Sequence, residues 1–152
     1  MVTQIIDEFL SKKVTKLLID YFKQREAKTF FLHNNRYPLF FGRHTGELPF
    51  LRNKLINKAK LINGSTIDWF HIVKWIPSHG QQLHFDLADE TTTLTSIIYL
   101  NDDFEGGETY FEDGTTFTPK VGRALYFDGN YHKHGVKPIT NGTRYTVSAW
   151  YH

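Results

Sequence analysis

The residues best placed to do chemistry in this chain are His84 and Asp86, followed 48 positions after the aspartate by His134 and then by Arg144. Two imidazoles and one carboxylate form the facial ligand set that binds non-haem Fe(II). The planar guanidinium of an arginine binds a carboxylate through two parallel hydrogen bonds, so Arg144 would suit a dicarboxylate beside such a metal. The spacing therefore predicts an iron site with an anion site next to it.

His84 and Asp86 belong to a predicted strand over 81–87, where side chains two positions apart point to the same face. The third ligand must come from a neighbouring strand, and both His132 and His134 are candidates. Three ligands on one face leave the other positions of an octahedral iron open, as in a catalytic site. The structural alternative is a His-x-Asp pair hydrogen-bonded within a polar loop, because the chain has eight histidines.

Arg144 lies in a predicted strand over 143–151. Period-two alternation places it on the same face as polar and pocket-sized residues, so it could point into the mouth of a barrel; these residues are Thr146, Ser148 and Trp150. The alternative is a surface arginine at the start of the strand.

Tyr99 follows an apolar run in a predicted strand over 92–100. A buried tyrosine needs a partner for its hydroxyl group. Tyr99 could therefore bind a carboxylate as well, or it could be a core residue bonded to the backbone, which the residue pattern alone favours.

Composition narrows the class of protein. A hydrophobic content of 40%, with 16% aromatic residues, indicates a folded globular chain rather than a disordered one. The absence of cysteine excludes disulfides and thiolate metal sites, so any metal must be held by imidazole and carboxylate. A net charge of +2 does not indicate a nucleic-acid or membrane partner. The opening residues do not form a signal-peptide pattern, so we expect a cytoplasmic protein.

The order of predicted elements indicates a single domain over 1–152, with helical support over 1–64 and a jelly-roll core over 65–152. Helices are expected over 4–24, with an interruption near Ser11, and over 49–62, whereas 28–47 is expected to be irregular and rich in aromatic residues. Strands are expected over about 66–76, 81–87, 92–100, 107–112, 115–117, 123–127, 133–138 and 143–151. About eight short strands without intervening helices predict a mainly β fold, a double-stranded β-helix with N-terminal supporting helices.

Over about residues 66–151 the chain resembles the 2-oxoglutarate- and Fe(II)-dependent dioxygenases, and within them the prolyl 4-hydroxylase-like group. Several blocks carry the resemblance in order. They are 83–86 (Leu-His-Phe-Asp), 97–102 (Ile-Ile-Tyr-Leu-Asn-Asp), 104–111 (Phe-Glu-Gly-Gly-Glu-Thr-Tyr-Phe), 119–127, 134–138 (His-Gly-Val-Lys-Pro) and 142–145 with Trp150.

The resemblance implies roles for individual residues. His84, Asp86 and His134 would bind Fe(II), and the family blocks favour His134 over His132 because it opens the His-Gly-Val-x-Pro stretch. Arg144 and Tyr99 would bind the distal carboxylate of 2-oxoglutarate. Molecular oxygen would be the oxidant and ascorbate a reductant. The family often has a pocket tyrosine where this chain has Trp75, and 28–47 would cover the substrate.

The resemblance further implies hydroxylation of an unactivated C–H bond, with a peptidyl prolyl residue as the best candidate substrate. The alternative is a small molecule or a free amino acid. The nucleobase-demethylating branch usually carries a second arginine six residues after the first, where this chain has Trp150, so we expect no nucleic-acid partner. A non-catalytic jelly-roll binding module and a zinc isomerase are the rival classes. Oligomeric state cannot be predicted from the sequence.

Overall fold

Antiparallel strands make up most of the regular structure. The computed structural model describes residues 2–86 and 91–152. Its largest sheet has six strands in the order β1-β9-β5-β12-β3-β2; their bounds are Val2–Ile6 (β1), Arg36–Phe41 (β2), Ile67–Trp75 (β3), Leu94–Tyr99 (β5), Ala124–Phe127 (β9) and Arg144–Tyr151 (β12). The prediction of a mainly β fold is confirmed.

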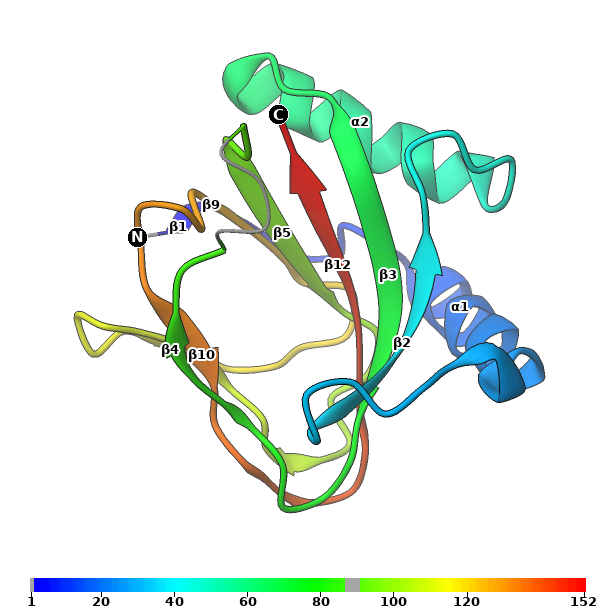
Figure 1. Ribbon diagram of the computed structural model, residues 1–152, viewed down its shortest axis with the longest axis vertical. Coiled ribbons are helices and arrows are strands. Elements are labelled where there is room, and N and C mark those ends of the chain that lie inside the picture. The colour runs from blue at the N-terminus through cyan, green and yellow to red at the C-terminus, as the bar shows by residue number, and fades with distance from the viewer. Residues whose placement is uncertain (1, 87–90) are drawn as a thin grey trace.

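A smaller four-stranded sheet faces one side of the six-stranded sheet (Figure 1). Its order is β4-β10-β7-β8, with bounds Gln81–His84 (β4), Thr109–Phe111 (β7), Thr116–Phe117 (β8) and His134–Val136 (β10). Two short strands, β6 (Glu105–Gly106) and β11 (Ile139–Asn141), pair with each other beside it. The two larger sheets enclose the space in which the predicted site residues meet.

The other side of the six-stranded sheet is covered by the helices α1 (Lys12–Gln24) and α2 (Pro49–Asn63) (Figure 1). A 3-10 turn, η1 (Glu26–Lys28), follows α1. The side chain of Ser11 accepts a hydrogen bond from the Val14 amide at 3.2 Å and caps the start of α1. Gly64 ends α2 in the left-handed conformation, with φ of 79°, which glycine adopts without strain.

Alternation along each strand separates a helix-packed core from the cavity wall. In β3, Phe70 and Ile72 are fully buried against α1 and α2, together with apolar residues of those helices. The intervening residues Trp69, His71 and Trp75 point to the opposite face and line a cavity. Because the strand period is two, one sequence run supplies both the core and the site.

Two element predictions are wrong. Residues 2–6 are not helical but form β1, which pairs antiparallel with β9, so the helix expected over 4–24 begins only at Lys12. The segment 28–47 is not wholly irregular, because Arg36–Phe41 forms β2 at the edge of the six-stranded sheet. Both strands are held by pairing with residues far along the chain, which local apolar spacing does not report.

The strand predicted over 81–87 is shorter in the structure: β4 ends at His84, Asp86 lies two residues beyond it, and residue 87 falls outside the described residues. The remaining strands agree with expectation to within a few residues. Since β1 and β2 join the large sheet, residues 1–64 contribute strands as well as helices. No helix among residues 2–86 and 91–152 is long and apolar enough to cross a membrane.

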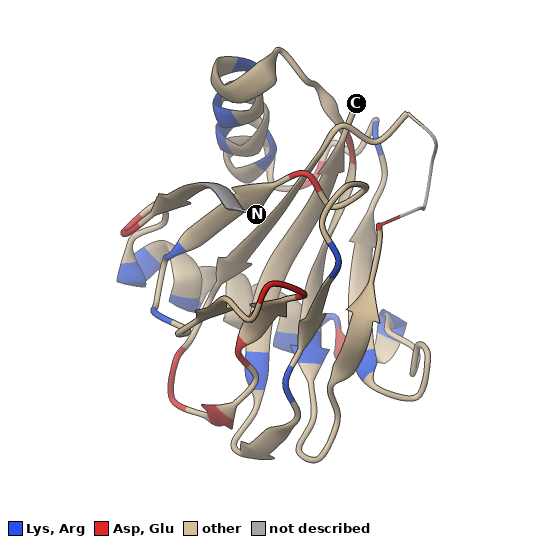
Figure 2. Ribbon diagram, turned by 90° about the vertical axis from the view of Figure 1, so that its left-hand side faces the viewer, with Lys and Arg blue, Asp and Glu red and all other residues tan. Residues whose placement is uncertain are grey.

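Both helices, which lie on the side of the large sheet away from the cavity, carry several lysine and arginine residues, and others lie on strands and loops (Figure 2). Of the Lys, Arg, Asp and Glu residues that the structure describes, Arg36, Asp86 and Arg144 line the cavity.

Candidate active site

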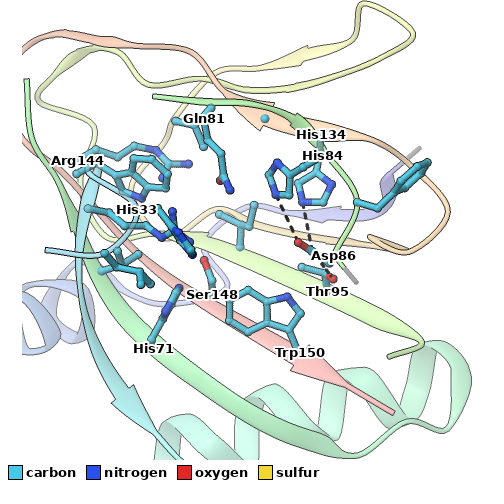
Figure 3. Close-up of a pocket in the computed structure, with 18 of the residues that line it drawn as sticks. His33, His71, Gln81, His84, Asp86, Thr95, His134, Arg144, Ser148 and Trp150 are labelled. Carbon is cyan, nitrogen blue, oxygen red and sulfur yellow. Dashed lines mark hydrogen bonds and ion pairs between the residues drawn. The ribbon is translucent and has the colours of Figure 1, made fainter. Parts of the chain in front are cut away.

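The three residues predicted to bind a metal lie together at one end of the cavity (Figure 3). One potential ligand atom from each of His84, Asp86 and His134 lies within 4.8 Å of the other two. His84 and His134 are direct cross-strand partners in the β4–β10 pair. The Asp86 carboxylate faces both rings, at 3.5 Å from His84 Nε2 and 3.2 Å from His134 Nε2.

Hydrogen bonds to the backbone orient both imidazoles. Nδ1 of His84 lies 2.8 Å from the Gln82 carbonyl oxygen, and Nδ1 of His134 lies 3.0 Å from the His132 carbonyl oxygen. A carbonyl only accepts, so each Nδ1 must carry a proton, and in that tautomer the Nε2 lone pair of each ring faces Asp86. Two lone pairs and a carboxylate converging on one point repel one another unless a cation lies between them. The donor set therefore fits a divalent metal.

The carboxylate of Asp86 is held in its ionised form. Burial favours the neutral acid. The two imidazole rings, which donate to the carboxylate when Nε2 carries a proton in place of a metal, and the Thr95 hydroxyl outweigh burial and lower the pKa of Asp86 well below its usual range. Thr95 Oγ1 donates to Asp86 Oδ2 at 2.9 Å, and the Asp86 amide donates to the Gly129 carbonyl at 2.8 Å. These contacts fix the carboxylate although it lies outside a strand.

His132, the other candidate for third ligand, lies elsewhere. Its ring packs edge-on against Tyr131 at 5.1 Å between centroids, and it lines a separate surface hollow with Glu112 and Lys133. It is not in the group with His84 and Asp86. The geometry therefore brings His134, and not His132, to the predicted metal site.

The cavity has a volume of about 320 Å³, at the lower end of the range for small-molecule sites. Arg144 lies at the end opposite the His84, Asp86 and His134 cluster, with Gln81 between them (Figure 3). One side is formed by Ser148 and Trp150, on the same strand face as Arg144, as the alternation predicts. An elongated molecule with a ligand for the metal at one end and an anion at the other would fit these two poles.

Arg144 is a buried cation rather than a surface residue, with 1% of its surface exposed. Its Nε donates to the Gly107 carbonyl at 2.9 Å, and a terminal nitrogen donates to Thr109 Oγ1 at 3.3 Å. Burial lowers the pKa of Arg144, and the neighbouring Tyr99 opposes that change. An arginine begins with a pKa above 12 and stays charged, so it calls for an anion.

Tyr99 lies behind Arg144 and is not among the residues that line the cavity. Its hydroxyl is 2.5 Å from Thr109 Oγ1, and the Arg144 guanidinium carbon lies 5.3 Å from the centre of its ring. Tyr99 therefore supports the position of Arg144. Its predicted bond to a co-substrate carboxylate stays a prediction.

The sequence alone predicts no role for two residues that line the cavity, Trp75 and His71. Trp75 Nε1 and His71 Nδ1 are buried and have no hydrogen-bond partner within the described ranges. Burial and the nearby Arg36 lower the pKa of His71 to about 3, so its ring is neutral at ordinary pH. Buried polar atoms without partners are rare and often mark ligand contacts. Alternation along β3 places both side chains on the same face as Trp69, and this period-two pattern could have identified them from the sequence.

This fold and ligand set define a class of protein, and the family comparison agrees. Residues 70–152 match the 2OG-Fe(II) oxygenase superfamily. The chain belongs to that superfamily.

Among curated proteins, the chain is similar to the rat prolyl 3-hydroxylase 2, with 44% identity over 64 residues. The chicken prolyl 3-hydroxylase 1 also matches with 44% identity over 64 residues. In each case the match covers 38% of this chain but only 9% of the much longer relative. The match is therefore to a short segment of each relative and not to the whole relative.

Solved structures match over nearly the whole chain. A viral collagen prolyl hydroxylase from Paramecium bursaria Chlorella virus-1, in complex with 2-oxoglutarate, has a TM-score of 0.77 at 22% identity, covering 97% of this chain and 93% of that one. A Pseudomonas putida prolyl-4-hydroxylase has a TM-score of 0.80 at 17% identity, covering 97% and 90%. At these identities the matches establish a shared fold.

Proposed function

We propose that this chain is an Fe(II)- and 2-oxoglutarate-dependent dioxygenase that hydroxylates an unactivated C–H bond of a prolyl residue in a peptide. It would do so as one domain built on a double-stranded β-helix. The observation that carries the proposal is the convergence of His84 Nε2, His134 Nε2 and the Asp86 carboxylate at one pole of a cavity whose other pole is Arg144.

The reaction balances with the three proposed reagents. One atom of O₂ enters the C–H bond to give an alcohol, and the other enters 2-oxoglutarate, which loses CO₂ and leaves as succinate. The C–H bond and the 2-oxo acid each lose two electrons, and O₂ takes up all four. Bound Fe(II) would supply the redox chemistry, and the protein would supply orientation and charge.

The protein's own contribution to co-substrate binding rests on Arg144 and Trp75. Arg144 offers a buried guanidinium that pairs with no carboxylate among residues 2–86 and 91–152, which suits the distal carboxylate of 2-oxoglutarate. Trp75 Nε1 is a buried donor that has no partner in the part of the chain that the structure describes, and the Arg144 guanidinium carbon lies 5.4 Å from the centre of the Trp75 ring. We infer that the indole N–H donates to the same ligand and so takes the place of the pocket tyrosine expected here.

The proposed substrate class rests on the relatives. Curated proteins that match include prolyl 3-hydroxylases, and a similar structure from Trichoplax adhaerens is a prolyl hydroxylase in complex with a peptide fragment of hypoxia inducible factor. In this chain the stacked rings of Trp69 and Trp150, 4.0 Å apart between centroids, offer an aromatic wall to a prolyl ring. The confined cavity also suits a free amino acid, which is the second candidate substrate.

Succinate release tests the core of the proposal. The purified chain, loaded anaerobically with Fe(II), should convert 2-oxoglutarate slowly to succinate when O₂ is admitted, and faster with a prolyl substrate. The Asp86→Ala variant should lose both rates. If the loaded protein with its cavity intact released no succinate under either condition, the dioxygenase assignment would be wrong.

A further inference from the structure

The cavity contains a second arginine that the proposed reaction does not use. Arg36, on the edge strand β2, lines the cavity and is half-buried. It is the cross-strand neighbour of Trp75, whose partner on the other side is Arg144. The two guanidinium carbons lie 5.3 Å and 5.4 Å from the Trp75 ring centre. Three adjacent strands therefore carry a row of cation, indole and cation.

Arg36 has no carboxylate paired with it in the described ranges. Its terminal nitrogen donates to the neighbouring Asn35 side-chain oxygen at 2.8 Å. Burial lowers the pKa of Arg36, and the charge of Asp86, which belongs to the proposed metal site, opposes this effect. A partly buried guanidinium left with neutral neighbours is an electrostatic cost that an anionic ligand would remove.

The co-substrate does not fully neutralise the positive charge of the cavity. Arg36 and Arg144 are the lining cations, Asp86 is the lining anion, and His71 is neutral. These residues together carry one net positive charge. A divalent metal adds two positive charges, and the two carboxylates of 2-oxoglutarate offset only two. One positive charge remains, and the cation not assigned to the co-substrate is Arg36.

The positions of Arg144 and Arg36 in the large sheet indicate that they bind different molecules. Arg144 is fully buried in a central strand, where it would meet a molecule that binds deep in the cavity. Arg36 is on an edge strand, next to Leu32 and His33, which line the same cavity and precede β2. An arginine in this place would meet a molecule that binds nearer the edge of the large sheet than the co-substrate does.

We propose that Arg36 binds a carboxylate of the primary substrate, so that the enzyme acts on a prolyl compound with a carboxylate close to the pyrrolidine ring. The inference rests on the proposed function and specifies its substrate. The prolyl ring would lie against Trp69 and Trp150 while Arg36 holds the anion. The carboxylate could be the α-carboxylate of a free amino acid or the side chain of an acidic residue next to proline in a peptide.

Binding is measured directly, without turnover. All three tryptophans of the chain, Trp69, Trp75 and Trp150, line the cavity, so their fluorescence reports occupancy. The protein is loaded anaerobically with Fe(II) and 2-oxoglutarate and titrated with two matched pairs. The first pair is L-proline and L-prolinamide; the second is the capped tetrapeptide Ala-Pro-Glu-Ala and its Ala-Pro-Gln-Ala counterpart.

In one pair, the acid should bind at least about tenfold more tightly than the amide, as expected for a charge-assisted hydrogen bond. The pair that shows the difference identifies the source of the carboxylate. Arg36→Gln should abolish the preference, Arg36→Lys should keep part of it, and Arg25→Gln, at an arginine packed on Tyr21 outside the cavity, should leave it unchanged.

Equal binding of acid and amide in both pairs, or no binding of either acid, would overturn the role of Arg36. So would a loss of 2-oxoglutarate affinity in Arg36→Gln with the acid preference intact. Succinate release in the absence of substrate is scored separately: if it persists while the acid preference is absent, the dioxygenase assignment stands and the substrate inference fails.

Discussion

His84 and His134 are direct partners across the β4–β10 pair, and their ring centroids lie 4.5 Å apart. Each ring is fixed by a hydrogen bond from Nδ1 to a backbone carbonyl two residues earlier in the chain. The two Nε2 atoms are thereby held towards one carboxylate before any metal binds. Such preorganisation reduces the conformational entropy that binding would otherwise have to overcome.

The first prediction distinguishes His134 from His132 as the third metal ligand. His134→Ala should weaken Fe(II) binding at least about a hundredfold because it removes a ligand, whereas His132→Ala should leave it nearly unchanged. Metal content after anaerobic loading and equilibrium dialysis measures both. Loss of iron in His132→Ala with retention in His134→Ala would reassign the third ligand.

The second prediction concerns Gly129. A Cβ atom at this position would overlap Asp86 Oδ2 and Thr95 Oγ1. Gly129→Ala should therefore displace the carboxylate and reduce Fe(II) affinity about tenfold or more, with a loss of about 1–3 kcal/mol in stability from overpacking. Gly46→Ala is the matched control, because a Cβ there meets no atom within 4 Å. Equal iron affinity in the two variants would show that Asp86 does not need this fixed position.

The third prediction concerns Arg144. Replacing it with alanine should raise the Kd for 2-oxoglutarate about 10- to 100-fold, since a charge-assisted bidentate pair is lost. Arg144→Lys keeps the charge but not the planar guanidinium, so its Kd for 2-oxoglutarate should lie between those of the wild type and Arg144→Ala. Anaerobic calorimetry with Fe(II) present gives the affinities for 2-oxoglutarate. Thermal unfolding shows whether each variant still folds after a buried side chain has been replaced. An unchanged Kd in a folded Arg144→Ala protein would remove Arg144 from the co-substrate site.

The fourth prediction is a pH dependence of stability. Burial lowers the pKa of His71 to about 3, from about 6.5 in the unfolded chain. Between these values the unfolded state binds more protons, so His71 contributes stability that is present above about pH 6.5 and is lost as the pH falls. Between pH 7 and pH 5, the wild type should lose about 2 kcal/mol more unfolding free energy than His71→Gln.

Urea unfolding at the two pH values measures the difference, and the other histidines cancel because both proteins contain them. Parallel pH profiles of wild type and His71→Gln would mean that His71 is protonated in the folded protein as readily as in the unfolded chain.

The chemistry of the site was largely readable from local pattern. His84 and Asp86 are two residues apart, and Arg144 shares a strand face with Ser148 and Trp150, because side-chain direction on a strand depends only on parity. Helix α2 was equally local, since Pro49 and Gly64 are start and stop signals for the backbone itself. These features need no knowledge of the rest of the chain.

The tertiary structure decided what depends on pairing between distant segments. Ile5 and Ile6 have apolar spacing compatible with a helix, yet β1 pairs with β9, more than a hundred residues later. The β10 register, not the spacing, brings His134 and not His132 opposite His84. Arg36 is brought to the cavity by the pairing of β2 with β3. Residue type and parity thus determined the chemical groups and their strand faces, whereas long-range strand pairing determined which groups meet, because backbone hydrogen bonds between strands carry no local sequence signature.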